Sequence, residues 1–284
     1  MYPYSSPRSD ASLPKARPLH RFLQGPTTTM TASSDVSTAA PSTVDDAEVA
    51  RFSAIAAEWW DPAGKFRPLH RFNPLRIAYI RDALARRFNR DPLAPQPLAG
   101  LRLVDIGCGG GLLAEPLARL GADVVGVDAA ERNIKVASVH AAETGVTVDY
   151  RNTTAEALVV AGEQFDAVIS LEVLEHVADV PLFITCCTDL VKPDGLLFFA
   201  TMNRTAKAYV TAILGAEYLL RWLPRGTHDW KKFLKPSEVA EELRRNGAIV
   251  RDLTGVVYNP LDGSFRIDPR DVQVNYLLFA EKVA

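Results

Sequence analysis

Hydrophobic and polar positions alternate regularly from about residue 101 onward. Short apolar runs, typical of buried strands, are separated by segments in which apolar positions recur with helical period. The expected strands span residues 101–106, 123–127, 146–151, 165–170 and 196–201. The expected helices span residues 112–120, 131–143 and 181–190, with a short helix near Glu156 and a turn at residues 192–195. This alternation predicts an α/β fold with a doubly wound, mostly parallel sheet.

The pattern changes after the fifth expected strand. A helix over residues 236–246 is expected to end at Gly247, and two closing strands are expected over residues 249–257 and 274–281. The complete prediction is therefore a Rossmann-like, seven-stranded sheet with helices on both faces, formed by residues 99–284.

Helical periodicity also marks residues 44–88. Asp45 or Asp46 suits the N-cap of a first helix that runs on to Trp59, and Pro74 suits the first turn of a second helix. We therefore expect residues 46–98 to form an N-terminal helical cap.

Residues 1–45 are rich in Ser, Thr, Pro and Ala and have little apolar periodicity. Such a segment buries too little surface to offset its ordering entropy, so we expect a disordered extension. Its basic residues are compatible with a transit peptide. A start of translation at Met30 is the interpretation that we favour.

Composition narrows the function classes. The chain has 284 residues, 48% of them apolar, and 32 basic against 34 acidic side chains give a net charge of −2. This balance argues against nucleic-acid binding, which usually needs a strongly basic surface. The three cysteines indicate neither a disulfide framework nor a zinc site, which favours a reducing compartment. No apolar run reaches the roughly 18 residues of a membrane span.

A glycine-rich loop, Gly107–Gly111, joins the first expected strand to the following helix. A phosphate-binding P-loop would need a lysine that this loop lacks. A dinucleotide-binding GxGxxG loop would need a third glycine where Leu112 stands. The GxGxG pattern of class I methyltransferases is met by Gly107, Gly109 and Gly111. This favours S-adenosylmethionine as cofactor.

Two acidic residues support this choice. Asp105, two positions before the loop, suits a cationic methyl donor and its amino group better than a pyrophosphate. Asp128 ends the second expected strand, where a carboxylate accepts both ribose hydroxyls of an adenosine. NAD would use Asp128 too, so an NAD-dependent oxidoreductase remains the alternative that Leu112 disfavours.

The fourth expected strand runs into a second acidic segment. On a helix, Glu172, Glu175 and His176 would share one face and could hold Mg²⁺, Mn²⁺ or Zn²⁺. A metal would lower the pKa of a bound catechol oxygen. His176 could instead act directly as general base. A third interpretation is a solvated helix start with a capping role for Glu172.

The chain resembles the ubiquinone biosynthesis O-methyltransferase family over roughly residues 48–282. The resemblance is carried by residues 59–62, 68–76, 105–111, 215–218, 226–233, 257–260 and 274–276. It implies O-methylation of polyprenyl catechol intermediates at two steps of ubiquinone biosynthesis. An alternative is a SAM-dependent methyltransferase that acts on another small phenolic or lipid acceptor. A further alternative is a non-catalytic, lipid-binding subunit of a biosynthetic complex.

The resemblance also implies roles for individual residues. Cofactor contacts are expected at Arg76, Gly107, Asp128 and Leu171, the last at a position where many relatives carry Met. Metal ligation is expected at Glu172, Glu175 and His176, of which Glu172 and His176 are the expected catalytic residues. The full set of expected cofactor-binding residues is Arg76, Asp105, Gly107, Gly109, Gly111, Asp128, Glu156 and Leu171.

An insertion, residues 203–233, follows the fifth expected strand. Residues 206–223 read as an amphipathic helix with flanking basic residues, suited to an anionic membrane surface or to a lid over the domain. His228 and Asp229 follow this helix and are expected to face the substrate. One interpretation is an additional general base, and the other is an N-cap role for Asp229. The expected location is the cytoplasm with peripheral contact to the inner membrane in a bacterium, or the mitochondrial matrix side with a transit peptide. Other ubiquinone-biosynthesis enzymes are expected partners.

Overall fold

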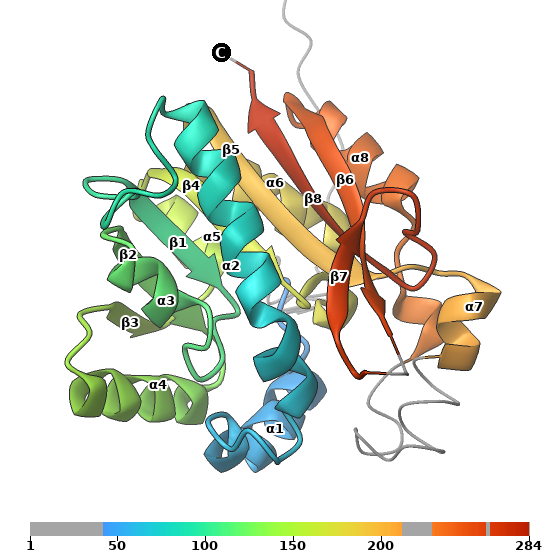
Figure 1. The fold of residues 1–284 in the computed structure, drawn as a ribbon, viewed down its shortest axis with the longest axis horizontal. Helices are drawn as coiled ribbons and strands as arrows, with labels where there is room; N and C mark the ends of the chain where they lie inside the picture. The colour runs from blue at the N-terminus through green and yellow to red at the C-terminus, as the bar shows by residue number, and fades with distance from the viewer. Residues whose placement is uncertain (1–41, 212–228, 260–261, 284) are drawn as a thin grey trace, which may run out of the picture. The chain divides into compact units, whose positions relative to one another are not determined.

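The computed structural model describes residues 42–211, 229–259 and 262–283 (Figure 1). Residues Pro41–Ala284 belong to one compact unit, so the N-terminal helices and the sheet are parts of the same body. The expected disordered extension lies outside the described residues except for residues 42–45 and stays a prediction.

Eight strands form one mixed sheet in the order β3-β2-β1-β4-β5-β8-β6-β7. Strands β1 to β5 pair in parallel, whereas β8 runs antiparallel to β5 and β6, and β7 antiparallel to β6. The strands are β1 (Arg102–Ile106), β2 (Asp123–Asp128), β3 (Asp149–Asn152), β4 (Phe165–Leu171), β5 (Val191–Met202), β6 (Ala248–Tyr258), β7 (Phe265–Asp268) and β8 (Asn275–Lys282). All seven expected strands are present.

The eighth strand, β7, was not predicted, because four residues are too short for the alternation to be read. The expected turn at residues 192–195 is also wrong as stated. These residues lie within β5, where pairing with β4 is irregular between Phe165 and Ala167 and where Asp194 has a φ of 62°.

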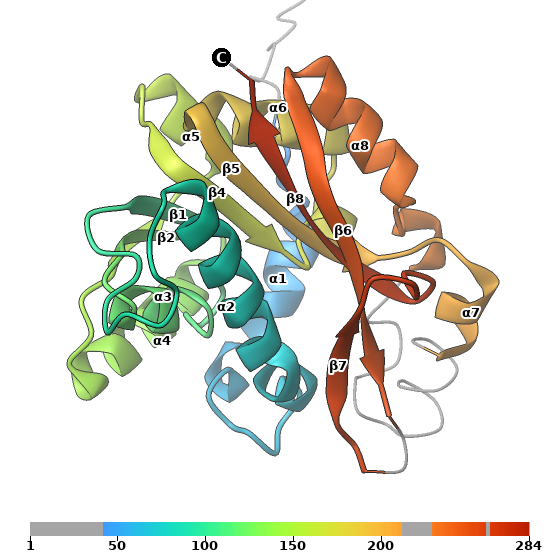
Figure 2. The ribbon, with the colours of Figure 1, turned by 45° about the horizontal axis from the view of Figure 1, so that its top comes forward.

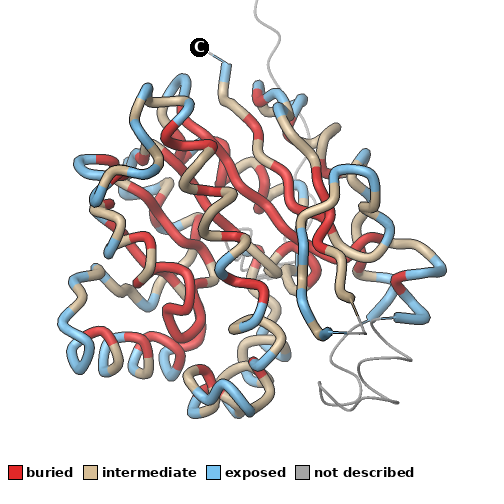
Figure 3. Tube along the Cα trace, viewed as in Figure 1, coloured by how far each residue is buried: buried red, intermediate tan, exposed pale blue. Residues whose placement is uncertain are grey.

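Helices cover both faces of the sheet (Figures 1 and 2). Leu103 of β1 packs with α2 and α3 on one face, and its neighbour Val104 packs with α5, α6 and α8 on the other. The central strands are therefore buried on both sides (Figure 3). The helical elements are α1 (Asp46–Ile55), η1 (Ala56–Glu58), α2 (Arg67–Arg87), α3 (Ala114–Arg119), α4 (Glu131–Thr144), α5 (Ala155–Val160), η2 (Leu174–His176), α6 (Val180–Leu190), α7 (Ala206–Ala208), η4 (Trp230–Lys232) and α8 (Pro236–Arg245).

The expected cap on the first helix is confirmed, because the Asp45 carboxylate accepts hydrogen bonds from the N–H groups of Ala47 and Glu48. The expected start of the second helix is wrong. Helix α2 begins at Arg67, so Pro68 occupies its first turn and Pro74 lies in its interior. Both prolines suit a first turn, and only tertiary packing decides between them.

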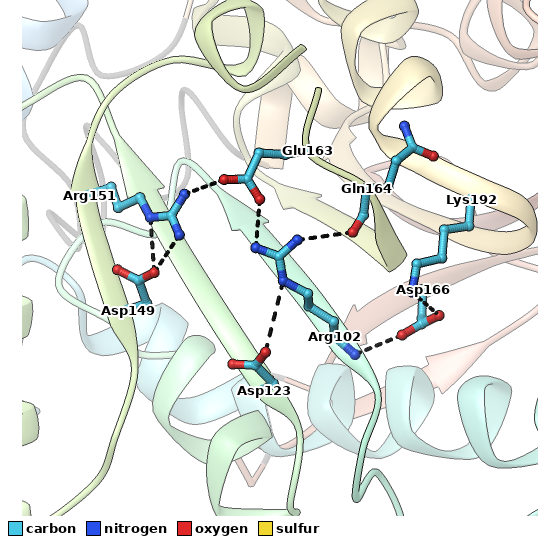
Figure 4. A network of polar contacts seen from close by, with 8 residues as sticks. All are labelled: Arg102, Asp123, Asp149, Arg151, Glu163, Gln164, Asp166 and Lys192. Atoms are coloured by element: carbon cyan, nitrogen blue, oxygen red, sulfur yellow. Dashed lines mark hydrogen bonds and ion pairs between the residues drawn. The ribbon is translucent and has the colours of Figure 1, made fainter. Parts of the chain in front are cut away.

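An ionic network ties together the amino ends of the parallel strands (Figure 4). The Arg102 backbone N–H at the start of β1 donates to Asp166 of β4 at 2.8 Å, and its guanidinium lies 2.6 Å from Glu163. Arg151 of β3 lies 2.7 Å from the other oxygen of Glu163. In open α/β sheets, ligands bind beyond the carboxyl ends of the strands, at the edge opposite to this network.

Candidate functional site

A cavity of about 670 Å³ lies beyond the carboxyl ends of β1, β2 and β4, against α1 and α2. It has apolar walls and a few charged groups, which is usual for a small-molecule site. Eight of the predicted site residues line it: Arg76, Asp105, Gly107, Asp128, Leu171, Glu172, Glu175 and His176.

The glycine loop has the backbone that its sequence requires. Gly107, Gly109 and Gly111 have φ values of 77°, 55° and 89°, in the region that favours glycine. A Cβ on Gly107 would lie 2.4 Å from a methyl group of Val173, and one on Gly111 would lie 2.1 Å from the Tyr150 hydroxyl. The loop therefore excludes side chains for local packing reasons as well as for access by a ligand.

Asp128 is fixed at the end of β2 by three donors. Its Oδ2 accepts from the Gly109 N–H at 2.9 Å, and its Oδ1 from the Ala130 N–H at 2.8 Å and the Asn133 amide at 3.2 Å. Burial raises the pKa of this carboxyl, and the three hydrogen bonds oppose the rise. Gly109 does not line the cavity, but it acts on it through Asp128.

Arg76 and Asp105 bring opposite charges into the cavity wall. The Arg76 guanidinium is buried, pairs with Glu172 and lies 4.0 Å above the Phe72 ring. Among the described residues, Nε of Arg76 and Oδ2 of Asp105 are buried without a hydrogen-bond partner. Burial raises the pKa of Asp105 to about 7, with a contribution from Asp128, while Arg76 opposes the rise. Both orphaned atoms call for a polar ligand.

The segment after β4 is not the helix that the sequence suggested. β4 continues to Leu171, and the Glu172 N–H still bonds to the Ala200 carbonyl of β5 at 2.8 Å. Glu172 then has a φ of 57°, which turns the chain into the short η2. The prediction that Glu172, Glu175 and His176 share one face of a helix is therefore wrong, because pairing of Glu172 with β5 prevents a helix from starting there.

The three side chains consequently have different partners. Glu172 pairs with Arg76, and Oε2 of the buried Glu175 accepts from the Thr201 hydroxyl at 2.7 Å. Burial raises the pKa of Glu175 to about 7; Glu172 adds to the rise, and His176 opposes it. Within the described residues, no group of three or more His, Cys, Asp or Glu side chains is arranged to hold a metal ion.

His176 faces α1. Its Nδ1 lies 3.3 Å from Oε2 of Glu48, and its ring meets the Phe52 ring edge-on at 5.1 Å. Burial would raise the pKa of Glu48, but the hydrogen bond and charge of His176, together with Arg51 and Lys232, hold it below its usual value. A guanidinium nitrogen of Arg51 also lies 3.3 Å from Nδ1, so a carboxylate and a guanidinium both face this ring nitrogen.

The short helix expected near Glu156 is present, but Glu156 itself is not among the residues that line the cavity. It lies on α5 outside the cavity lining, and its Oε1 accepts from the Thr43 N–H at 2.5 Å. The Thr43 carbonyl in turn accepts from the Ala178 N–H at 2.9 Å. Glu156 thus fastens the segment before α1, and residues 153–155 line the cavity instead.

Several lining residues were missed, most of them because they come from parts of the chain far from the glycine loop. They are Thr43, Glu48, Phe52, Trp59, Phe72, Asn133 and Phe265. The tryptophan pair Trp59–Trp60 was visible as a motif, but nothing in its spacing assigns it to the glycine loop.

Comparison with known proteins identifies close relatives. Residues 104–199 match the family described as methyltransferase domain. The chain is 58% identical over 247 residues to the ubiquinone biosynthesis O-methyltransferase of Sinorhizobium fredii, covering 87% of this chain and 99% of that protein. It is also 58% identical over 245 residues to the Brucella anthropi protein of the same name, and this match covers 86% of this chain and 98% of that protein. The similarity therefore extends well beyond the glycine loop.

Solved structures share the fold at lower identity. A SAM-dependent methyltransferase from Thermotoga maritima has a TM-score of 0.54 at 19% identity, covering 83% of this chain and 99% of that one. The magnesium protoporphyrin IX methyltransferase from Synechocystis, solved with bound SAM, has a TM-score of 0.50 at 21% identity. This match covers 73% of this chain and 78% of that one. These likenesses establish the class I methyltransferase fold.

Proposed function

The chain belongs to the ubiquinone biosynthesis O-methyltransferase family and is a SAM-dependent enzyme, and from this premise we propose that it methylates ring oxygens of polyprenylated catechol- and phenol-type intermediates at two steps of the pathway. The observation that carries the proposal is a single cavity in which buried charges adjoin an aromatic wall. Arg76 joins the two parts, because it faces Asp105 and Glu172 while stacking on Phe72.

The charged part suits the cofactor. The orphaned Arg76 Nε would donate to its carboxylate, and the orphaned Asp105 Oδ2 would accept from its ammonium group. Asp128 would accept from the ribose hydroxyls. When bound, S-adenosylmethionine supplies an electrophilic methyl group on a sulfonium sulfur. Leu171 and residues 153–155 would border the adenine.

The aromatic part suits the ring of the acceptor. Phe72 of α2 and Phe265 of β7 line the cavity with 5.3 Å between their ring centroids, and Leu69 and Met202 extend this apolar wall. A phenolic ring held there would gain apolar burial and aromatic contacts. Its oxygen would then face the acidic part of the cavity, where Glu172 and His176 lie.

Proton removal is assigned to His176. Nδ1 lies 3.3 Å from both Oε2 of Glu48 and a guanidinium nitrogen of Arg51. Nε2 therefore accepts the phenolic proton in the tautomer in which Nδ1 carries its hydrogen toward Glu48, and Glu48 then stabilises the imidazolium that results. The ring oxygen then bonds to the methyl carbon as the carbon–sulfur bond breaks. Exclusion of water and alignment of the two reactants by the cavity walls lower the barrier.

The alternative to direct proton removal by His176 is a divalent cation bound by Glu172, Glu175 and His176. The donor types fit Mg²⁺ or Mn²⁺, but their placement does not, because Glu172 is paired with Arg76 and Glu175 with Thr201. No step is therefore routed through a metal. Ligation would require Glu172 to leave Arg76, which a cofactor carboxylate competing for the same guanidinium favours.

We also propose peripheral contact with an anionic membrane. The expected helix over residues 206–223 lies mostly outside the described residues. Its first turns and η4 carry exposed Tyr209, Val210 and Trp230, with lysines beside them. Within residues 42–211, 229–259 and 262–283, no helix is both long and apolar enough to cross a bilayer.

Complementation tests the proposed function. In a bacterial strain that lacks its own ubiquinone biosynthesis O-methyltransferase, this chain is expected to restore ubiquinone, measured in lipid extracts. The Asp128→Asn variant, expressed to the same level, is expected not to restore it. An accumulated wild-type chain that restores no ubiquinone would contradict the proposal.

A further inference from the structure

Trp59 lies directly against the glycine loop. A Cβ placed on Gly109 would come within 2.4 Å of Cζ2 of this tryptophan, and one on Gly110 within 2.4 Å of its Cβ. The indole is buried and stacks on Phe66 with 3.7 Å between the ring centroids. The glycines thus admit a side chain from the N-terminal helices as well as leaving space for a ligand.

The indole N–H begins a chain of hydrogen bonds that ends at Asp128. Nε1 of Trp59 donates to Oδ1 of Asn133 at 2.9 Å, and Nδ2 of Asn133 donates to Oδ1 of Asp128 at 3.2 Å. Asn133 is only 2% exposed, so water competes little for either bond. All three residues line the cavity.

The direction of this chain is fixed by chemistry. An indole N–H can only donate, so the amide oxygen of Asn133 must face Trp59. The NH₂ group of Asn133 then faces Asp128 and donates to it. The reverse orientation would set the amide oxygen against a carboxylate oxygen and the NH₂ group against the indole N–H. Trp59 therefore selects the only orientation in which Asn133 can hold Asp128.

We propose that Trp59 is a positioning residue for the cofactor. Through Asn133 it holds the Asp128 carboxylate in the orientation that accepts the ribose hydroxyls. This inference rests on the proposed cofactor role of Asp128. It also gives the segment between α1 and α2 a defined part in cofactor binding.

Trp60 provides a matched comparison on the same loop. Its Nε1 donates to the Gly110 carbonyl at 2.8 Å, and its ring stacks on His140 at 3.4 Å. Its single N–H is donated to the glycine loop and not to Asn133, and Trp60 does not line the cavity. Loss of its N–H therefore reports loop packing alone.

The test measures binding of S-adenosylhomocysteine and of its 2′,3′-dideoxy analogue to the full chain by calorimetry. Trp59→Phe keeps an aromatic ring and removes the N–H, so it is expected to weaken S-adenosylhomocysteine about fivefold, the equivalent of one hydrogen bond. The same variant is expected to change affinity for the dideoxy analogue less than about twofold. Trp60→Phe is expected to affect both ligands equally.

A double-mutant cycle provides the second readout. Asn133→Ala and the Trp59→Phe/Asn133→Ala double variant are expected to bind S-adenosylhomocysteine equally, because the tryptophan acts only through Asn133. Additive losses, equal losses for the two ligands in Trp59→Phe, or an unchanged affinity for S-adenosylhomocysteine would each overturn the proposal. Thermal melts confirm that the variants are folded. The readout is binding alone, so it is separate from whether a prenylated phenol is the methyl acceptor.

Discussion

Asp105 is a buried carboxyl group whose surroundings only partly compensate its charge. Burial raises its pKa to about 7, Asp128 contributes to the rise, and Arg76 opposes it. In the unfolded chain the group has its ordinary acidic pKa. The protonated Asp105 therefore contributes fully to the free energy of unfolding below that ordinary pKa, and this contribution is lost as pH rises through about 7. A ligand ammonium group beside the orphaned Oδ2 would favour the ionised form.

Affinity for the cofactor product should consequently depend on pH. S-adenosylhomocysteine is expected to bind about tenfold more tightly at about pH 8 than at about pH 6, because binding requires Asp105 to lose its proton. Calorimetry in buffers of different ionisation enthalpy should detect the released proton at the lower pH. Asp105→Asn should remove the pH dependence. A wild-type affinity that is flat over this range would exclude the proposed role of Asp105.

The metal proposal is tested by binding and not by turnover. Free Mn²⁺ has a paramagnetic resonance signal that bound Mn²⁺ lacks, so titration measures binding directly. The wild-type chain is expected to bind one ion per chain. It should bind the ion more tightly when the carboxylate of S-adenosylhomocysteine pairs with Arg76, because Glu172 is then released. Glu175→Gln should weaken binding at least about tenfold. Glu115→Gln, at a buried carboxylate outside the cavity, is the control. Equal affinity in Glu175→Gln and wild type would refute the ligand set.

At the scale of elements, periodicity predicts regular segments and fails where tertiary contacts decide. The strand preceding the glycine loop is confirmed, because a buried parallel strand reads as an apolar run. Residues 172–176 were assigned to a helix although β5 draws Glu172 into strand pairing. β7 was missed, and with it Phe265. The glycine loop was predictable because its backbone needs specific residues, whereas Thr43, Glu48 and Trp59 reach the site only through folding.

The exposed apolar side chains just after α7 and on η4 form the surface to test for membrane contact. Tyr209 is 43% exposed, Val210 54% and Trp230 38%. The combined Tyr209→Ala, Val210→Ser and Trp230→Ala variant should float less with anionic liposomes than wild type, because it loses apolar area at the interface. Val160→Ser removes an exposed side chain on α5 and should float like wild type. Equal flotation of the triple variant and wild type would count against this surface.

At the scale of the whole molecule, two parts of the described chain line the cavity: the sheet and the N-terminal helices. The sheet supplies Asp105, the glycine loop and Asp128, while α1, α2 and the segment between them supply Glu48, Trp59 and Arg76. The cofactor and the acceptor would therefore meet where these parts join. Methyl transfer between them is the central claim.

Methyl transfer is measured most directly with the purified full-length chain, isotopically methyl-labelled S-adenosylmethionine and a short-chain prenylated catechol. Mass spectrometry is expected to find one labelled methyl group on a ring oxygen. The product should form with wild type and fall at least about a hundredfold with Asp128→Asn. A wild-type chain that binds S-adenosylhomocysteine yet leaves the catechol unlabelled, with and without added Mg²⁺, would contradict the account.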